Sequence, residues 1–315
     1  MKARVLIAIV AAVCFALPAW SAEVSPKSLV IADTGFSETD SVIASHTVLQ
    51  LCIMDWYACP NGSNFQESGT AAMLTSTQIS TSGFSHGSKM ARAAIAAYPG
   101  VKLILVRIIA QSSQGARMPT SESIVTKVLA WARKNAATYN IGAIAISQGS
   151  NKLGTNARKC FSSPATDKEV AALKAKGIYT FFPAGNEGRT DAINWPACIS
   201  DAVAVGALDK KGLISQYSND ALGQVDIYEP GYLIDTVTQP QYSEENGTSF
   251  STQYAAARWL SIVNQFPNIR PSLIYWSFIF SGDPVTNSKG INGWNTNIDA
   301  LKLTLTSQYG LKTAA

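Results

Sequence analysis

Histidine is scarce in this sequence, which has only 2 among 315 residues. Charged side chains are also sparse: they make up 15% of the chain, against 47% hydrophobic residues, a composition that indicates an extensively buried globular core. No cluster of basic residues is interleaved with aromatics, so nothing argues for nucleic-acid binding. The chain also lacks internal repeats, linkers and low-complexity breaks, and we therefore expect one large domain rather than two.

The N-terminal segment lacks the length of a membrane span. Residues 1–22 have a basic start, an apolar run that is too short to cross a bilayer, and a small-residue cleavage site. This pattern predicts a secretory signal peptide, followed by a single domain at 23–315 that is secreted or periplasmic. After removal of the signal peptide we expect no membrane attachment, and the formal charge falls from +4 to about +2 because two basic residues leave with it.

Cysteine is limited to five residues, of which one leaves with the signal peptide. An even number in an oxidising compartment favours two disulfides. Four cysteines allow three pairings, and pairing of sequence neighbours is favoured, which joins Cys52 to Cys59 and Cys160 to Cys198. A zinc site is the alternative, but neither histidine lies near these cysteines and the spacing of the first pair is not that of typical ligands.

Short apolar runs alternate with helical patterns along most of the chain. Strands are predicted at 28–32, 101–109, 142–147, 178–182 and 202–207. Helices are predicted at 88–98, 121–137, 167–176, 249–264 and 297–308. Such alternation indicates an α/β fold, a three-layer sandwich with a mainly parallel central sheet covered on both faces. The Ser-, Thr- and Gly-rich stretch from Asp33 to His86 is expected to contain an extra surface loop held by Cys52 and Cys59.

Ser249 stands where a Gly-Thr-Ser turn enters the helix predicted at 249–264. At a helix N-terminus, free backbone N–H groups and the helix dipole favour negative charge. An acyl-transfer nucleophile benefits from that position because the oxyanion forms beside it. Most Gly-Thr-Ser triplets are simple turns, so the serine needs partners before it indicates a function.

Three residues upstream could supply those partners. His86 precedes Gly87 at the head of a predicted helix, whereas His46 lies in a polar, loop-like stretch, so His86 is the preferred general base. Asp33 ends the apolar strand at 28–32, where it is either a turn residue or a buried acid that orients His86, since a buried carboxylate is costly unless paired. Asn186 lies in a glycine-flanked turn, which is ordinary turn chemistry, but its amide could also donate to an oxyanion.

In the order of these four residues the chain resembles the subtilisin-like serine proteases, the subtilase or peptidase S8 family. The resemblance covers residues 28 to 260 and rests on six local sequences in order. They are Asp33-Thr34-Gly35, His86-Gly87, Ser147-Gln148-Gly149, Ala184-Gly185-Asn186-Glu187-Gly188, Trp195-Pro196-Ala197 and Asn246-Gly247-Thr248-Ser249.

The resemblance implies a subtilisin-like fold and a secreted serine endopeptidase. It makes Ser249 the nucleophile, His86 the general base, Asp33 the acid that orients it, and Asn186 an oxyanion-hole donor. It also makes Ser147, Gln148 and Gly149 the edge on which an extended peptide adds as a strand. No cofactor is required for this chemistry. Many family members hold structural calcium, but the sequence shows no ligand set for it.

The chain departs from the family pattern at several places. Lys89 stands where a second histidine is usual, and Phe250 and Gln253 replace methionine and proline after the nucleophile. Only about ten residues separate the predicted signal peptide from Asp33, too few for the propeptide that many secreted family members carry. We therefore expect the domain either to fold unaided or to use an inhibitor and chaperone supplied by another chain. These departures keep two other functions open, a catalytically silent protein-binding scaffold and a peptide acyl transferase with the same triad.

Overall fold

A computed structural model describes residues 25–56, 58–81, 83–112, 115–154, 163–233, 245–287 and 292–309, with backbone alone at 151–154 and 292. The predicted signal peptide at 1–22 lies outside these residues. Within them, no helix combines the length and apolar character that a membrane span requires.

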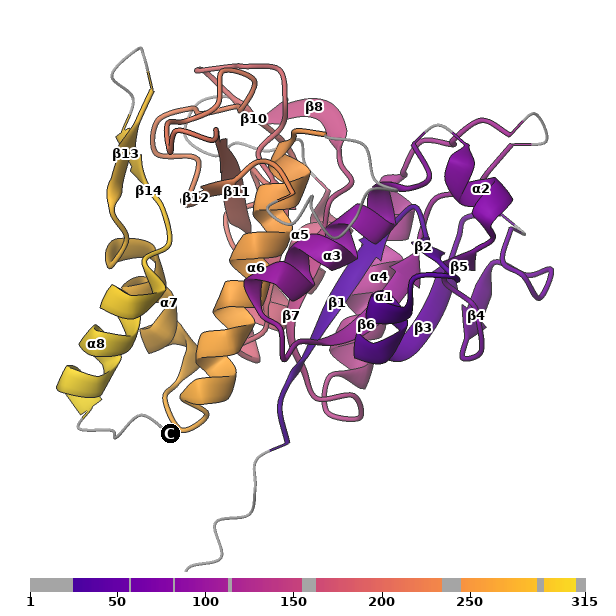
Figure 1. Ribbon diagram of the computed structural model, residues 1–315, viewed down its shortest axis with the longest axis horizontal. Helices are drawn as coiled ribbons and strands as arrows, with labels where there is room; N and C mark the ends of the chain where they lie inside the picture. Colours follow the sequence, from indigo (N-terminus) through magenta and orange to yellow (C-terminus); the bar gives the residue numbers. More distant parts are fainter. Residues whose placement is uncertain are drawn as a thin grey trace, which may run out of the picture.

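One eight-stranded sheet forms the centre of the molecule (Figure 1). Its strands, in spatial order, are β12 (Ile227–Pro230), β11 (Val203–Leu208), β9 (Tyr179–Pro183), β7 (Ile141–Ile146), β1 (Ser28–Asp33), β6 (Lys102–Arg107), β3 (Thr47–Ile53) and β4 (Phe65–Glu67). Neighbouring strands are parallel except at one edge, where β4 runs antiparallel to β3. The carboxyl ends of the parallel strands therefore meet along one edge of the sheet, where such folds bind ligands.

Helices cover both faces of this sheet, and alternation along β1 shows how. Leu29 and Ile31 pack in the core beneath α3 (His86–Ala97) and α6 (Thr248–Gln265). Val30 and Ala32 point to the opposite face and pack in the core with α4 (Glu122–Asn135) and α5 (Pro164–Ala175). Successive side chains of a strand face opposite sides, so a continuous apolar run marks a strand buried on both faces. The predicted three-layer α/β sandwich is confirmed.

The remaining elements decorate the two ends of the sheet. They are β2 (Phe36–Ser37), α1 (Ser41–His46), β5 (Met73–Leu74), α2 (Ser76–Ser80), β8 (Ser150–Gly154), β10 (Ile193–Trp195), α7 (Pro271–Phe280), β13 (Pro284–Thr286), β14 (Asn292–Trp294) and α8 (Ile298–Tyr309). Small two-stranded sheets pair β10 with β8, β13 with β14 and β2 with β5.

The five predicted strands and five predicted helices are all present, with shifted ends. The stretch at 33–86 also contains α1 and β3, a strand of the main sheet, neither of which is predicted from the sequence. Leu51, Cys52 and Ile53 of β3 are buried, but the polar residues around this short apolar run obscured it. A disulfide joins Cys52 to Cys59 and fixes the turn after β3. In the second predicted pair, Cys160 lies outside the described residues.

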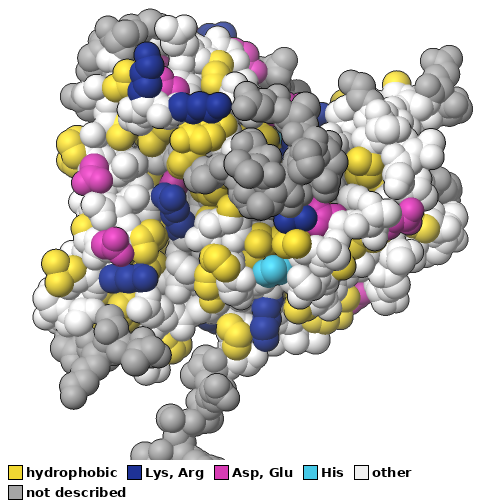
Figure 2. Space-filling view, in the orientation of Figure 1, with side chains coloured by type: hydrophobic (Ala, Val, Ile, Leu, Met, Phe, Trp, Pro, Cys, Tyr) yellow, Lys and Arg dark blue, Asp and Glu magenta, His cyan; other side chains and the backbone are white. Residues whose placement is uncertain are grey.

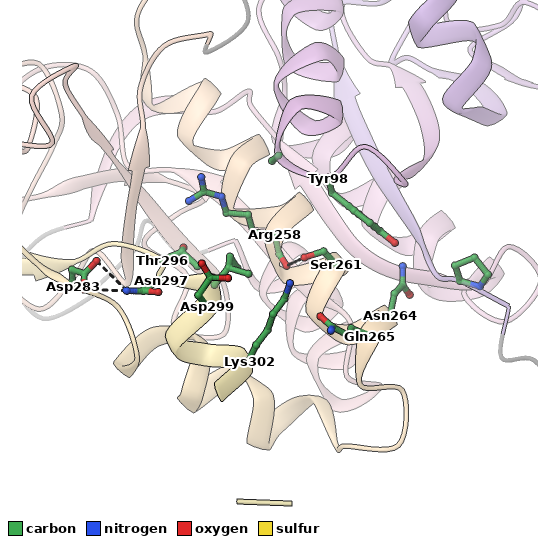
Figure 3. Close-up of a pocket in the computed structure, with 13 residues that line it drawn as sticks. Tyr98, Arg258, Ser261, Asn264, Gln265, Asp283, Thr296, Asn297, Asp299 and Lys302 are labelled. Carbon is green, nitrogen blue, oxygen red and sulfur yellow. Dashed lines mark hydrogen bonds between the residues drawn. The ribbon is translucent and has the colours of Figure 1, made fainter. Parts of the chain in front are cut away.

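The surface in Figure 2 mixes uncharged, basic and acidic side chains without one dominant charged patch on that face. A cavity of about 830 Å³ lies between the C-terminal half of α6 and the segment that leads into α8 (Figure 3). Arg258, Asn264 and Lys302 are among its polar lining residues. At 1.5 Å per residue, Arg258 stands about 14 Å along the helix from Ser249, so this cavity is separate from the site described next.

Candidate active site

The four predicted chemical residues lie at element ends along the carboxyl edge of the sheet. Asp33 is the last residue of β1, and His86 is the first of α3. Asn186 follows β9, and Ser249 is the second residue of α6. Because α3 packs against α6 over the same face of the sheet, residues more than 200 positions apart in the sequence come together.

Asp33 and His86 form a hydrogen-bonded pair, with 2.8 Å between Asp33 Oδ1 and His86 Nδ1. Asp33 is fully buried, and the same Oδ1 accepts from the backbone N–H of Thr34 at 2.7 Å. Burial alone would raise the pKa of Asp33, but the charge and hydrogen bond of His86, the Thr34 N–H and the charge of Arg117 together hold it below its usual value. With Nδ1 bound to a carboxylate, the imidazole keeps Nε2 for a second partner.

Thr34 and Gly87 fix the helix that carries His86 against the end of β1. The Thr34 hydroxyl donates to the Phe84 carbonyl at 3.1 Å and accepts from the Gly87 N–H at 3.0 Å. A Cβ at Gly87 would lie 2.2 Å from the backbone oxygen of Gly35. Only glycine therefore allows α3 to start this close to the strand.

Ser249 is 8% exposed, and its Oγ donates to the Ser147 carbonyl at 3.4 Å. In the described part of the chain no hydrogen bond joins Ser249 to His86. Hydrogen bonds between a nucleophile and its base are often long or absent until substrate binds, and rotation about one side-chain bond redirects the hydroxyl. The arrangement thus provides a serine and an oriented base at the start of neighbouring helices.

The Ser147 side chain links Ser249 to Gln253 through two hydrogen bonds. The Ser147 hydroxyl donates to the Ser249 carbonyl at 3.1 Å and accepts from Gln253 Nε2 at 2.8 Å. Both side chains are buried. Gln253, which departs from the family pattern, therefore ties α6 to the end of β7. No local sequence pattern indicates this contact.

Asn186 faces the start of α6 and holds its amide in one orientation. Its Oδ1 accepts from both the backbone N–H and the hydroxyl of Thr248, each at 2.9 Å. This network assigns the other amide atom, Nδ2, as a donor that remains beside Gly247. A donor at this position, together with the backbone N–H groups at the start of α6, forms the kind of site that stabilises an oxyanion.

Lys89 is a second departure that the structure places in the site. Its side chain is 2% exposed, and Nζ pairs with Glu245 Oε2 at 2.8 Å. Lys89 lies one turn after His86, and Glu245 lies four residues before Ser249. The ion pair therefore joins the helix that begins at His86 to the segment that precedes Ser249.

The predicted substrate edge at Ser147, Gln148 and Gly149 follows β7 directly. The Gln148 side chain is 6% exposed and does not extend along that edge: its Nε2 donates to Asp33 Oδ1 at 3.2 Å. A Cβ at Gly149 would lie 2.5 Å from the Trp195 carbonyl oxygen, so glycine allows the two backbones to approach.

His46 lies outside this group. It ends α1, where its Nδ1 is 2.8 Å from the Val42 carbonyl and its Nε2 is 2.9 Å from the Pro99 carbonyl. Both ring nitrogens of His46 thus face backbone oxygens, a pattern that indicates a structural role. The described residues contain no group of three or more His, Cys, Asp or Glu side chains placed to bind a metal, and no ligand set for calcium is assigned.

Comparison with known proteins matches residues 28–277 to the subtilase family. Among curated relatives, the chain is 32% identical over 110 residues to an intracellular serine protease of Paenibacillus polymyxa, a match that spans 33% of each protein. It is 25% identical over 219 residues to subtilisin DY of Bacillus licheniformis, covering 65% of this chain and 73% of that protein. A solved protease of Pseudoalteromonas arctica superposes with a TM-score of 0.70 at 15% identity, over 88% of this chain and 89% of that one; it shows a shared fold.

Proposed function

Since the chain belongs to the subtilase family of serine peptidases, which hydrolyse peptide bonds, we propose that it is a secreted serine endopeptidase with its acyl-enzyme on Ser249. In this proposal His86 is the general base and acid, Asp33 orients it, and Asn186 contributes to the oxyanion hole. The hydrogen-bonded Asp33–His86 pair beside the N-terminus of α6 is the observation that carries the proposal.

The chemistry proceeds in two transfers of the acyl group. His86 Nε2 takes the hydroxyl proton as Ser249 Oγ attacks a peptide carbonyl, while the buried Asp33 carboxylate stabilises the resulting imidazolium. Asn186 Nδ2 and the Ser249 N–H stabilise the negative oxygen of the tetrahedral intermediate. His86 then protonates the leaving amine, and an activated water releases the peptide acid and restores Ser249.

A protein or peptide substrate is proposed to add as an extended strand to the backbone at Ser147–Gly149. The proposed steps use no cofactor. Secretion rests on the signal-peptide pattern at 1–22, and an inhibitor or chaperone supplied by a separate chain stays a prediction.

The direct test is labelling of the purified protein with a fluorophosphonate probe and peptide mapping of the adduct. We expect the adduct on Ser249, no labelling of Ser249→Ala and severely reduced labelling of His86→Ala. His46→Ala is the matched control, since it removes the other histidine, and it should label as the wild type does. Thermal unfolding of each variant establishes that it is folded.

An unlabelled wild-type protein with intact fold would reject the proposed mechanism and favour a silent binding scaffold. Product analysis on a peptide substrate distinguishes hydrolysis from acyl transfer. Free carboxylates mark hydrolysis, and new amide bonds mark transfer.

A further inference from the structure

Gln148 directs its side chain to the acid–base pair instead of to the open site. It follows β7 and is 6% exposed. Its Nε2 lies 3.2 Å from Asp33 Oδ1 and 3.5 Å from His86 Nδ1. Asp33 Oδ1 therefore accepts three hydrogen bonds, from His86, from the Thr34 backbone and from Gln148.

Arg117 determines which amide atom of Gln148 faces Asp33. Its guanidinium donates to Gln148 Oε1. Arginine has only donors, so the amide must turn its oxygen to Arg117 and its N–H₂ to the carboxylate. A flipped amide would face the carboxylate with an oxygen and Arg117 with a second set of donors, and both contacts would be repulsive.

The loop between β6 and α4 presents Arg117 to this site. An isolated bridge pairs Gln111 with Arg117, and the N–H of Met118 donates to the Ala110 carbonyl at 3.0 Å. The Arg117 stem passes over Gly83, where an added Cβ would lie 3.5 Å from Cδ. The guanidinium thus comes from the loop after β6, and the Gln148 amide comes from the segment after β7. Both lie at the end of β1, where Asp33 stands.

The charge of Arg117 is available to act on Asp33. The side chain is exposed, and it forms no ion pair within the described ranges of the chain. Its positive charge adds to the effects of His86 and Thr34 that lower the pKa of Asp33 against burial. A cation one amide away from a buried carboxylate favours the ionised acid and disfavours a second cation nearby.

We propose that Gln148 and Arg117 act together as positioning residues. They hold the Asp33 carboxylate toward His86 Nδ1 and partly compensate the negative charge that this carboxylate presents to the imidazole. The inference rests on the proposed function, because positioning matters only if His86 is the base. Neither side chain takes part in bond making. Gln148 keeps Asp33 Oδ1 in place, so His86 retains its proton on Nδ1. The Nε2 atom of His86 is then free to accept from Ser249.

Two measurable effects follow from this role. Loss of the Gln148 donor misaligns the acid and slows the chemical step without removing a substrate contact. It also leaves the negative charge of the Asp33 carboxylate less compensated, so this charge stabilises the protonated form of the His86 imidazole more strongly. The acidic limb of the pH–rate profile should then move to higher pH.

Gln148→Met is the main variant, since methionine has similar length but no amide. With a peptide p-nitroanilide that the wild type cleaves, we expect kcat to fall on the order of ten-fold, with KM within about two-fold. The acidic limb should rise by roughly half a pH unit. Gln224→Met is the matched control: it removes a buried glutamine from the connection between β11 and β12, and all three quantities should stay at wild-type values.

Arg117 variants separate orientation from charge. Arg117→Lys keeps the cation but loses the planar fork, so the acidic limb should stay in place while kcat falls. Arg117→Ala loses both the cation and the fork, so the acidic limb should move to higher pH and kcat should fall. Because this side chain is exposed, these variants decide the matter even if Gln148→Met fails to fold.

Three results would overturn the inference. One is a Gln148→Met enzyme with wild-type kcat and pH limb; another is a raised KM with unchanged kcat, which would mean that the side chain contacts substrate. The third is an Arg117→Ala enzyme with wild-type kcat and limb. Failure of the proposed function looks different, because the wild type itself would then escape fluorophosphonate labelling at Ser249.

Discussion

Asp33 gathers three hydrogen bonds on one carboxylate oxygen and is fully buried. An isolated carboxylate in such a place would be strongly destabilising. Here its partners more than offset the cost of burial, because its pKa lies below the usual value. The acid therefore contributes to folding as well as to the chemistry of the site.

Acid unfolding should report this contribution. A folded-state pKa below the unfolded value of 3.8 gives stability that is present above that pH and lost as pH falls through the folded pKa. We expect Asp33→Asn to lower the free energy of unfolding near pH 7 by about 1.5–3 kcal/mol, the typical worth of hydrogen bonds to a charged group. The difference from the parent should shrink once the pH drops below about 4.

Urea unfolding from pH 7 to pH 3 measures that difference. Both proteins should carry Ser249→Ala, so that neither can digest itself. A difference that stays constant through the acid range would mean that the Asp33 charge does not support the fold.

Sequence reasoning finds a site residue when its neighbours in the chain carry the signal. Asp33, His86, Asn186 and Ser249 each stand within two residues of a glycine, close to the end of a predicted element. Gln148 was predicted only as part of the substrate edge, and the contacts made by its side chain were not foreseen. The two partners of Gln148 lie 31 and 115 positions away in the sequence. The partner of Lys89 lies 156 positions away, and that of Gln253 lies 106 positions away. Such contacts exist only after folding, so no local pattern predicts them.

At the scale of elements, the start of α3 depends on one close backbone approach. Gly87 lies against Gly35, and the space between them excludes a Cβ. A small side chain there would push α3 away from β1. Because His86 is the preceding residue, the displacement would separate it from Asp33.

Gly87→Ala should therefore lower both stability and activity. Overpacking a tight contact costs typically about 1–3 kcal/mol, and we expect fluorophosphonate labelling to slow by more than ten-fold. Gly100→Ala is the control, since its Cβ would meet only the Tyr98 ring, at 3.1 Å. Equal labelling rates for the two variants would show that the close approach does not position the base.

The elements that sequence reasoning missed, β3 and α7, lack the pattern that marks a buried strand or an amphipathic helix. A strand buried on both faces is a continuous apolar run, and β1, β6, β7, β9 and β11 were all predicted on that basis. In contrast, β3 is an edge-side strand with an exposed Val48, embedded in polar residues. Helix α7 is apolar on nearly every side, so it lacks the periodicity that marks an amphipathic helix.

For the molecule as a whole, Glu229 connects the sheet to the C-terminal segment. It is fully buried at the edge strand β12 and pairs with Arg258 Nη1 of α6 at 2.6 Å. It also accepts a hydrogen bond from Thr296, which lies between β14 and α8 beside the cavity in Figure 3. Burial raises the pKa of Glu229, and Arg258 and Thr296 oppose that rise.

Thr296→Val should therefore destabilise the fold by about 1.5–3 kcal/mol, since it removes a hydrogen bond to a buried charged group. The shape of the side chain at position 296 stays almost unchanged. Thermal or urea unfolding measures the loss. Thr286→Val, at an exposed position of β13, is the control and should stay within about 0.5 kcal/mol of wild type. Matching stabilities for the two variants would mean that the C-terminal segment is held by apolar packing alone.

In the proposed mechanism, the placement of Ser249 at the head of α6 also determines when activity can begin during synthesis. A growing chain makes the acid first, the base next and the nucleophile last, with α6 completed only at Gln265. That helix packs across β1, β7, β9 and α3, so it needs the earlier strands and helices as its surface. A ribosome-bound fragment that ends before α6 holds an acid and a base but no nucleophile. In that mechanism, peptide hydrolysis thus begins only when Ser249 has been made and α6 has packed onto these elements.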